Sequence, residues 1–133
     1  MTLLLLDTTV LVHREGSSLD LDDLIHDEDE PAIAAITIAE LGVGVELASG
    51  RRRTARRALL DDLIDSLPVL AYDLEVARSH TQLLVTARAS GRPRGAHDLI
   101  IVATARATRR TVVTTDHTGF DDLPGVPVRK PGS

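Results

Sequence analysis

The chain alternates between short apolar runs and longer stretches in which apolar residues recur at helical spacing. The first run, Leu3–Leu6, is stopped by Asp7 and two threonines, a pattern typical of a strand buried on both faces. Further strands are predicted at residues 32–36, 68–72 and 111–115, with a short edge strand at 124–128.

Between these runs the spacing predicts helices. They are expected to start near Val10, Asp20, Thr37, Arg51, Asp73 and Ala96; Pro31 should end the acid-rich second one and Gly91 the fifth. Strands that alternate with helices predict βαβ units, a mostly parallel sheet and helices on both faces. In such α/β folds, ligands bind at the carboxyl ends of the strands.

Four acidic residues fall at or near that rim of the predicted sheet. Asp7 and Asp116 directly follow the first and fourth strands, Glu40 lies in the first turn of the helix after strand two, and Asp98 lies near a helix start. Carboxylates gathered in one crevice repel one another unless a cation is present. Mg²⁺ and Mn²⁺ prefer oxygen ligands, so the pattern indicates metal-assisted phosphodiester hydrolysis.

Three of these acids also have a purely structural interpretation. Thr37 and Glu40 fit a capping box, in which Glu40 would bond only to backbone amides. Asp98 is suited to the positive end of its helix, and Asp116 to a turn. Asp7 is the hardest to explain structurally, because it must lie at a buried strand end.

Four motifs in register carry a resemblance to a known family. They are Leu5-Leu6-Asp7-Thr8-Thr9-Val10-Leu11, Ile36-Thr37-Ile38-Ala39-Glu40-Leu41, the segment Ala96-His97-Asp98-Leu99-Ile100-Ile101-Val102-Ala103-Thr104-Ala105, and Val113-Thr114-Thr115-Asp116. The chain resembles PIN-domain ribonucleases of the VapC toxin type. The resemblance implies a three-layer α/β/α sandwich. The chain length predicts one domain over residues 1–130, and the Pro-Gly-Ser ending predicts a disordered tail at 131–133. The resemblance also implies a Mg²⁺- or Mn²⁺-dependent endoribonuclease that hydrolyses RNA with a metal-activated water. A cytoplasmic location is expected because no membrane span or signal peptide is predicted.

The resemblance assigns roles by position. Asp7 and Asp98 look like the main metal ligands, with Asp116 and Glu40 completing the cluster directly or through water. Thr9 and Thr114 match small hydroxyl residues that support the site. A VapB-type antitoxin that covers the acidic crevice and a toxin homodimer are the implied partners, besides the RNA substrate.

Charge is unevenly distributed along the chain. The net charge is −5, yet residues 1–50 hold eleven acids and one base, whereas residues 51–133 hold nine acids and fourteen bases. A run of arginines opens the fourth predicted helix: Arg51, Arg52, Arg53, Arg56 and Arg57. These side chains are expected either to contact RNA phosphates or to form a solvated helix face.

Composition excludes several classes of function. Aromatic residues make up 2% of the chain, too few for base-stacking platforms, and cysteine is absent. No segment suggests a membrane span or a signal peptide, and no phosphate-binding glycine loop occurs. The histidines lack metal-ligand spacing, so His97 and His117, which adjoin candidate acids, are expected to support the site or to lie at the surface.

Two alternatives to the ribonuclease remain open. A haloacid-dehalogenase-type phosphatase also places an Asp after its first strand, but it needs a second acid where this chain has Thr9, and a suitably placed lysine. The other alternative is a non-catalytic, metal-dependent module that binds RNA or a protein. Turnover of a phosphomonoester without RNA cleavage would favour the phosphatase, and RNA binding without new RNA ends would favour the module.

Overall fold

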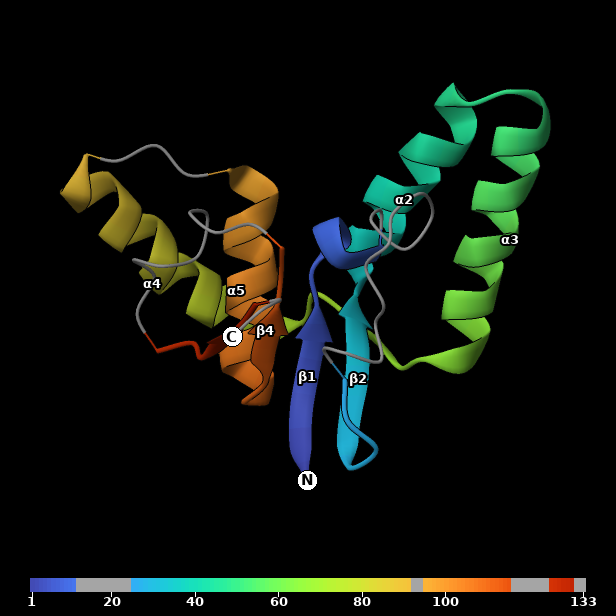
Figure 1. The fold of residues 1–133 in the computed structure, drawn as a ribbon. Coiled ribbons are helices and arrows are strands. Elements are labelled where there is room, and N and C mark those ends of the chain that lie inside the picture. The colour runs from blue at the N-terminus through green and yellow to red at the C-terminus, as the bar shows by residue number, and fades with distance from the viewer. Residues whose placement is uncertain (12–24, 92–94, 116–124, 131–133) are drawn as a thin grey trace.

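A five-stranded sheet forms the centre of the molecule (Figure 1). The computed structural model describes residues 1–11, 25–91, 95–115 and 125–130. The strands are β1 (Thr2–Leu6), β2 (Asp29–Ala34), β3 (Val69–Leu70), β4 (Thr111–Val113) and β5 (Val128–Arg129). Their order is β3-β2-β1-β4-β5 and every pairing is parallel, which confirms the predicted α/β class.

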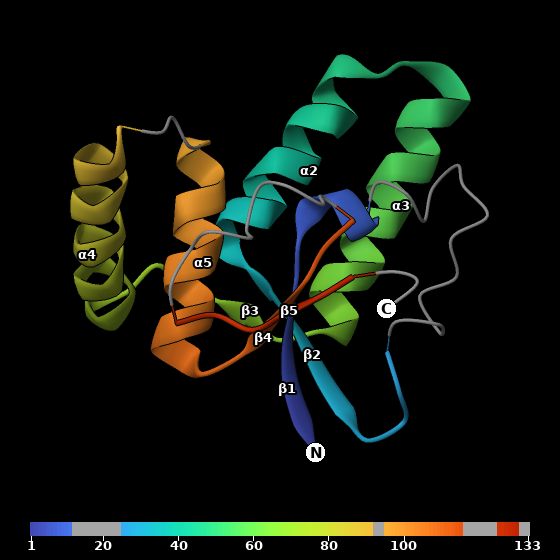
Figure 2. The same ribbon diagram turned by 60° about the vertical axis from the view of Figure 1, so that its left-hand side comes forward.

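Helices cover both faces of this sheet. They are α2 (Ala35–Leu47), α3 (Gly50–Ser66), α4 (Leu74–Ser90) and α5 (Ala96–Thr108), and residues 8–11 are also helical. Helices α4 and α5 pack together on one side, and α2 and α3 on the other (Figures 1 and 2). The arrangement is the expected three-layer sandwich. Of the described helices, none is both long enough and apolar enough to cross a bilayer.

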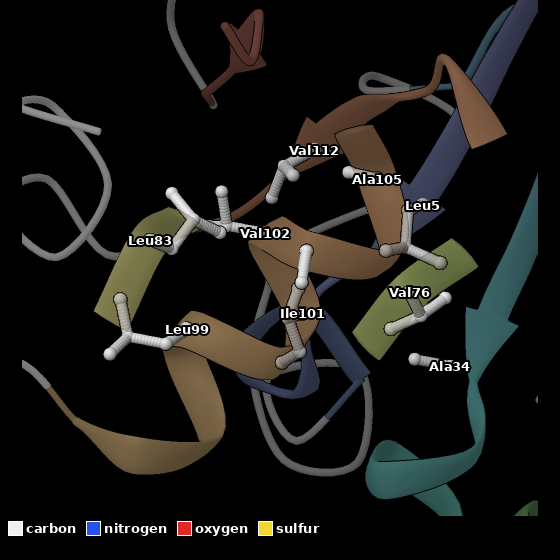
Figure 3. Packing of buried hydrophobic residues seen from close by; sticks show 10 residues of the cluster. Leu5, Ala34, Val76, Leu83, Leu99, Ile101, Val102, Ala105 and Val112 are labelled. Atoms are coloured by element: carbon white, nitrogen blue, oxygen red, sulfur yellow. The ribbon is translucent and has the colours of Figure 1, made fainter. Parts of the chain in front are cut away.

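The leucines of β1 contribute side chains to two separate hydrophobic cores. Leu5 points into the core beneath α4 and α5, where it joins Val76, Leu83 and Val102 (Figure 3). Leu4 and Leu6 point to the opposite face, into the core that includes Leu63 of α3. Alternate residues of a strand face opposite sides, so β1 is buried on both faces, as its sequence predicts.

The predicted boundaries of the two elements just before Glu40 are wrong. Strand β2 runs from Asp29 to Ala34 rather than over 32–36, because pairing with β1 extends it back to Asp29, opposite Thr2. Pro31 therefore lies inside a strand and ends no helix; residues 20–24 of that predicted helix lie outside the described part. Helix α2 begins at Ala35, two residues before the predicted start.

Elsewhere the differences are small. Asp73 caps α4 by accepting a hydrogen bond from the Val76 amide at 3.0 Å, and Gly91 ends the helix with φ of 67°, both as predicted. Strands β3 and β4 are shorter than expected, and β5 is displaced to Val128–Arg129. Residues 131–133, predicted to be a disordered tail, lie outside the described residues.

Candidate active site

Asp7 lies at the carboxyl end of β1, in the middle of the sheet. Leu6 pairs with Val113 of β4, and the Asp7 amide continues this pairing by donating to the Val113 carbonyl at 2.8 Å. The side chain is thereby fixed between two strand ends, and Asp7 is only 2% exposed. A carboxylate this deeply buried requires compensating contacts.

The contacts described for Asp7 all come from neutral donors. Oδ1 accepts from the Thr8 amide at 2.8 Å, and Oδ2 accepts from the hydroxyls of Thr9 at 2.8 Å and Thr114 at 2.7 Å. The two hydroxyl oxygens are 3.3 Å apart. Thr114 reaches Asp7 because β1 and β4 are parallel neighbours that end side by side. The structure thus places both threonines singled out in the sequence against this carboxylate.

Hydrogen bonds from neutral donors leave the Asp7 charge poorly compensated. Burial raises the pKa of Asp7 above its ordinary value of 3.8, and the hydrogen bonds from Thr114, Thr9 and the Thr8 amide lower it only in part. The nearby Glu40 carboxylate raises the pKa of Asp7 further. Such a site favours the binding of a cation.

Glu40 enters the site from the second turn of α2. Its Oε1 accepts from the Thr8 hydroxyl at 2.8 Å, and its Oε2 lies 3.2 Å from Nδ1 of His97 on α5. The capping-box interpretation is wrong, as is the expected position in the first turn, because the helix begins at Ala35 and Thr37 lies inside it. The Thr37 side chain is buried, with its hydroxyl 3.4 Å from that of Thr8.

Asp98 lies in the first turn of α5, next to His97 in the chain. Its side chain folds back over the helix start: a Cβ added to Gly95, the residue before the helix, would lie 3.0 Å from Asp98 Oδ2. Glycine at this position therefore leaves room for the carboxylate. Asp116, the fourth candidate acid, lies outside the described residues.

The described part of the site offers carboxylate oxygens as possible metal ligands. Within the described ranges, which omit Asp116, no three His, Asp or Glu side chains lie close enough together to hold a metal ion. Mg²⁺ commonly binds through one or two carboxylates and keeps several waters. The buried Asp7 carboxylate with Glu40 beside it therefore fits a hard divalent cation in the chemistry of its oxygen donors.

A cavity of about 190 Å³ adjoins Glu40 between α2 and α3. Thr8, Glu40 and Arg56 contribute to its lining, and Arg56 Nη1 donates to the Gly44 carbonyl at 2.9 Å. Of the arginines singled out in the sequence, Arg56 is the one that lines this cavity. Arg51, Arg52 and Arg53 are exposed on α3, and Arg53 and Arg57 pair with Glu46 at 3.1 and 3.2 Å.

Sequence reasoning missed the position of Thr8 and the specific contact of His97. Thr8 touches both acids, through its amide to Asp7 and its hydroxyl to Glu40. The signal for Thr8 was the pair of hydroxyl residues directly after the buried Asp7. For His97 the only signal was its position before Asp98, and sequence alone does not reveal that α2 faces this helix turn.

Comparison with known proteins identifies the family. The family model described as PIN domain matches residues 4–126 of the 133 residues. The chain belongs to the PIN domain family. This PIN domain is 37% identical over 93 residues to the VapC ribonuclease Y4jK of Sinorhizobium fredii, a match that covers 67% of this chain and 66% of that protein. It is 32% identical over 111 residues to ribonuclease VapC5 of Mycobacterium tuberculosis, with coverages of 84% and 81%.

A solved structure supports the same relationship. The PIN domain matches a crystal structure of VapBC-5, a member of the VapBC family of toxin–antitoxin systems from Mycobacterium tuberculosis, with a TM-score of 0.82 and 31% identity. The match covers 98% of this chain and 99% of the other. The predicted family and three-layer fold are both confirmed.

Proposed function

We propose that this PIN domain is an endoribonuclease toxin that hydrolyses RNA with the help of Mg²⁺ or Mn²⁺. The observation that carries the proposal is the Asp7 carboxylate, which is buried at the centre of the sheet edge, bonded to neutral donors and close to Glu40. A domain keeps such an arrangement at a cost in stability, and perturbed carboxylates of this kind are typical of active sites. The relatives named ribonucleases support RNA as the substrate.

In this proposal the four acids together form the metal site. Asp7 and Asp98 would hold the cation, with Asp116 and Glu40 completing the cluster directly or through water. When bound, a divalent ion would lower the pKa of water and stabilise the charge that develops on the phosphoryl group. The threonines at positions 9 and 114 keep the Asp7 carboxylate in one orientation.

Glu40 is the described acid best placed to orient the attacking water. Its side chain is 27% exposed, and each carboxylate oxygen can accept a second hydrogen bond besides the one from Thr8 or the contact to His97. Water reaching Glu40 would therefore be held beside the buried Asp7.

The arginines of α3 are the proposed contacts to the RNA backbone. Arg56 lines the cavity that also contains Glu40, and Arg51, Arg52 and Arg53 are exposed on the same helix. Guanidinium groups bind phosphate through paired hydrogen bonds. RNA binding should consequently weaken as the salt concentration rises.

An antitoxin of the VapB type is the proposed protein partner. The solved relative from Mycobacterium tuberculosis belongs to the VapBC toxin–antitoxin family. A partner arginine inserted beside Asp7 and Glu40 would supply the positive charge that the hydrogen bonds of Asp7 do not provide. Homodimerisation and a cytoplasmic location remain predictions; light scattering and cell fractionation test them.

Cleavage of a labelled RNA tests the proposed activity. Wild type should produce fragments in Mg²⁺ and none in EDTA, and Asp98→Asn should lose cleavage while its circular dichroism spectrum is unchanged. Asp73→Asn is the matched control, because asparagine also caps helices and Asp73 lies at the start of α4. Equal cleavage by the Asp98 variant, or cleavage that persists in EDTA, would contradict the proposal.

A further inference from the structure

The Glu40 carboxylate is held from two different elements. The Thr8 hydroxyl, just after β1, donates to Oε1 at 2.8 Å, and the His97 ring, on the first turn of α5, brings Nδ1 to 3.2 Å from Oε2. His97 is 57 positions from Glu40 in the chain, so the contact joins the two helical layers at the rim of the sheet.

The contact with His97 restrains the orientation of the Glu40 carboxylate. A glutamate side chain has three rotatable bonds, and a partly exposed one loses its orientation unless both oxygens are restrained. Thr8 alone fixes one oxygen and leaves the carboxylate free to rotate about that bond. A second contact at Oε2 fixes the plane of the carboxylate next to Asp7.

The contact also leads to an expected tautomer of His97. A carboxylate oxygen only accepts hydrogen bonds, so the 3.2 Å contact favours a proton on Nδ1, and we expect a neutral His97 to be the Nδ1–H tautomer with Nε2 as the acceptor. The His97 side chain is 54% exposed, and solvent alone does not hold a histidine in that tautomer. Its tautomer therefore reports the contact with Glu40.

We propose that His97 is a positioning residue, which acts on the reaction through Glu40 by holding its carboxylate toward Asp7. The kinetic part of this inference rests on the proposed ribonuclease function. Residues that orient the groups around a metal typically change its affinity about 10- to 100-fold when they are removed. His97→Ala should lower the metal affinity by only about tenfold, because Thr8 still holds Oε1.

Imidazole nitrogen NMR on the full chain tests the contact without any activity. Neutral His97 should be the Nδ1–H tautomer in wild type and shift toward Nε2–H in Glu40→Ala. His26, whose side chain is exposed, should keep the same spectrum in both proteins. An unchanged His97 spectrum in Glu40→Ala would overturn the proposal.

Three substitutions at position 97 distinguish a positioning role of this side chain from a purely structural role. His97→Asn places an amide nitrogen near the position of Nδ1, His97→Gln places one near Nε2, and His97→Ala removes the donor. His97→Ala and His97→Gln should lower Mn²⁺ affinity and kcat about tenfold with little change in KM, and His97→Asn should restore most of both. Equal loss in the Asn and Gln variants, or none in any, would contradict the assignment.

A double variant tests whether His97 acts through Glu40. His97→Ala should add less than about a twofold loss of kcat to Glu40→Gln, because the two changes disrupt the same contact. An additive loss confined to KM would mean that His97 binds RNA directly, which would overturn the proposal. If wild type shows no Mg²⁺-dependent cleavage, the proposed function fails, and the tautomer and Mn²⁺ affinity alone decide the role of His97.

Discussion

Two aspartates at opposite ends of the parallel sheet are held in opposite ways. Asp7 follows the carboxyl end of β1, and its hydrogen bonds come from an amide and two hydroxyls. Asp29 begins β2; its Oδ2 accepts from the His26 amide at 2.8 Å and pairs with Nη1 of Arg129 at 2.6 Å. One carboxylate has a cationic partner from within the chain, whereas the described contacts of the other are neutral.

The direction of each pKa shift follows from that difference. Burial raises the pKa of Asp7, whereas the His26 amide and then Arg129 lower the pKa of Asp29. Asp29 is an acid whose charge the fold itself stabilises. The described contacts of Asp7 include no cation, so a cation from outside the chain would stabilise its charge. Under the proposed function, the contrast is between a structural carboxylate and a metal-binding one.

The sharpest test of the comparison is catalytic. Asp7→Asn should lower RNA cleavage in Mg²⁺ at least about a hundredfold, equivalent to about 2.7 kcal/mol of transition-state stabilisation. Asp29→Asn should leave kcat and KM within about twofold, since its partner lies in the fold. Initial rates on one labelled RNA measure both. Similar losses in the two variants would erase the distinction.

Stability should move in opposite directions in the same two variants. Because the pKa of Asp7 is raised on folding, Asp7 contributes to stability below pH 3.8, its ordinary pKa. That contribution is lost as the pH rises through the pKa of Asp7 in the folded protein. Asn keeps the shape without the charge, so Asp7→Asn should raise the Tm in EDTA at neutral pH by several degrees. Because the pKa of Asp29 is lowered on folding, Asp29 contributes to stability above pH 3.8. That contribution is lost as the pH falls through the pKa of Asp29 in the folded protein.

Asp29→Asn should accordingly lower the Tm at neutral pH, and the deficit should shrink in acid. Thermal melts in EDTA between about pH 3 and pH 7 follow both trends. A lower Tm for Asp7→Asn at neutral pH would show that the Asp7 charge is stabilised within the chain, against the account.

Loss of a single hydroxyl from Asp7 should have an intermediate effect. Thr114→Val keeps the shape but removes the 2.7 Å hydrogen bond to Oδ2, and Mn²⁺ affinity should fall about tenfold. Thr114→Ser should retain the hydroxyl and most of the affinity. Thr81→Val, on the exposed side of α4, is the control. Calorimetric titration with Mn²⁺ gives the affinities.

Two glycines provide the smallest test. Gly95→Ala would place a Cβ 3.0 Å from Asp98 Oδ2 and force that side chain to shift, at a cost of about 0.5–1 kcal/mol and thus about two- to fivefold in Mn²⁺ affinity. Gly42→Ala lies within α2 with nothing inside 4 Å of its Cβ, so it should raise the free energy of unfolding by about 0.5–1 kcal/mol. Equal affinities in the two variants would contradict the position of Asp98.

The sequence predicts the parts of the fold that its local pattern determines. Four consecutive leucines before Asp7 locate β1, and Asp73 and Gly91 mark the ends of α4. The start of β2 was missed because Asp29 and Glu30 are poor strand formers, recruited only by pairing with β1. Local pattern does not contain that long-range pairing.

The same limit applies to the site. Parallel strand order places Asp7 at the carboxyl end of the sheet and brings Thr114 beside it, and both positions follow from where the strands end. The contact between His97 and Glu40 depends on how α2 and α5 meet, which spacing along the chain does not determine. Its detection required the structure.

Manganese binding by electron paramagnetic resonance tests the central claim most directly, because it needs neither an RNA nor an antitoxin. Purified wild type at neutral pH should bind Mn²⁺, Asp7→Asn should lose that binding, and Asp29→Asn should retain it. Binding of equal strength in the Asp7 and Asp29 variants, or none in wild type, would contradict the claim that the buried Asp7 carboxylate is completed by a divalent cation.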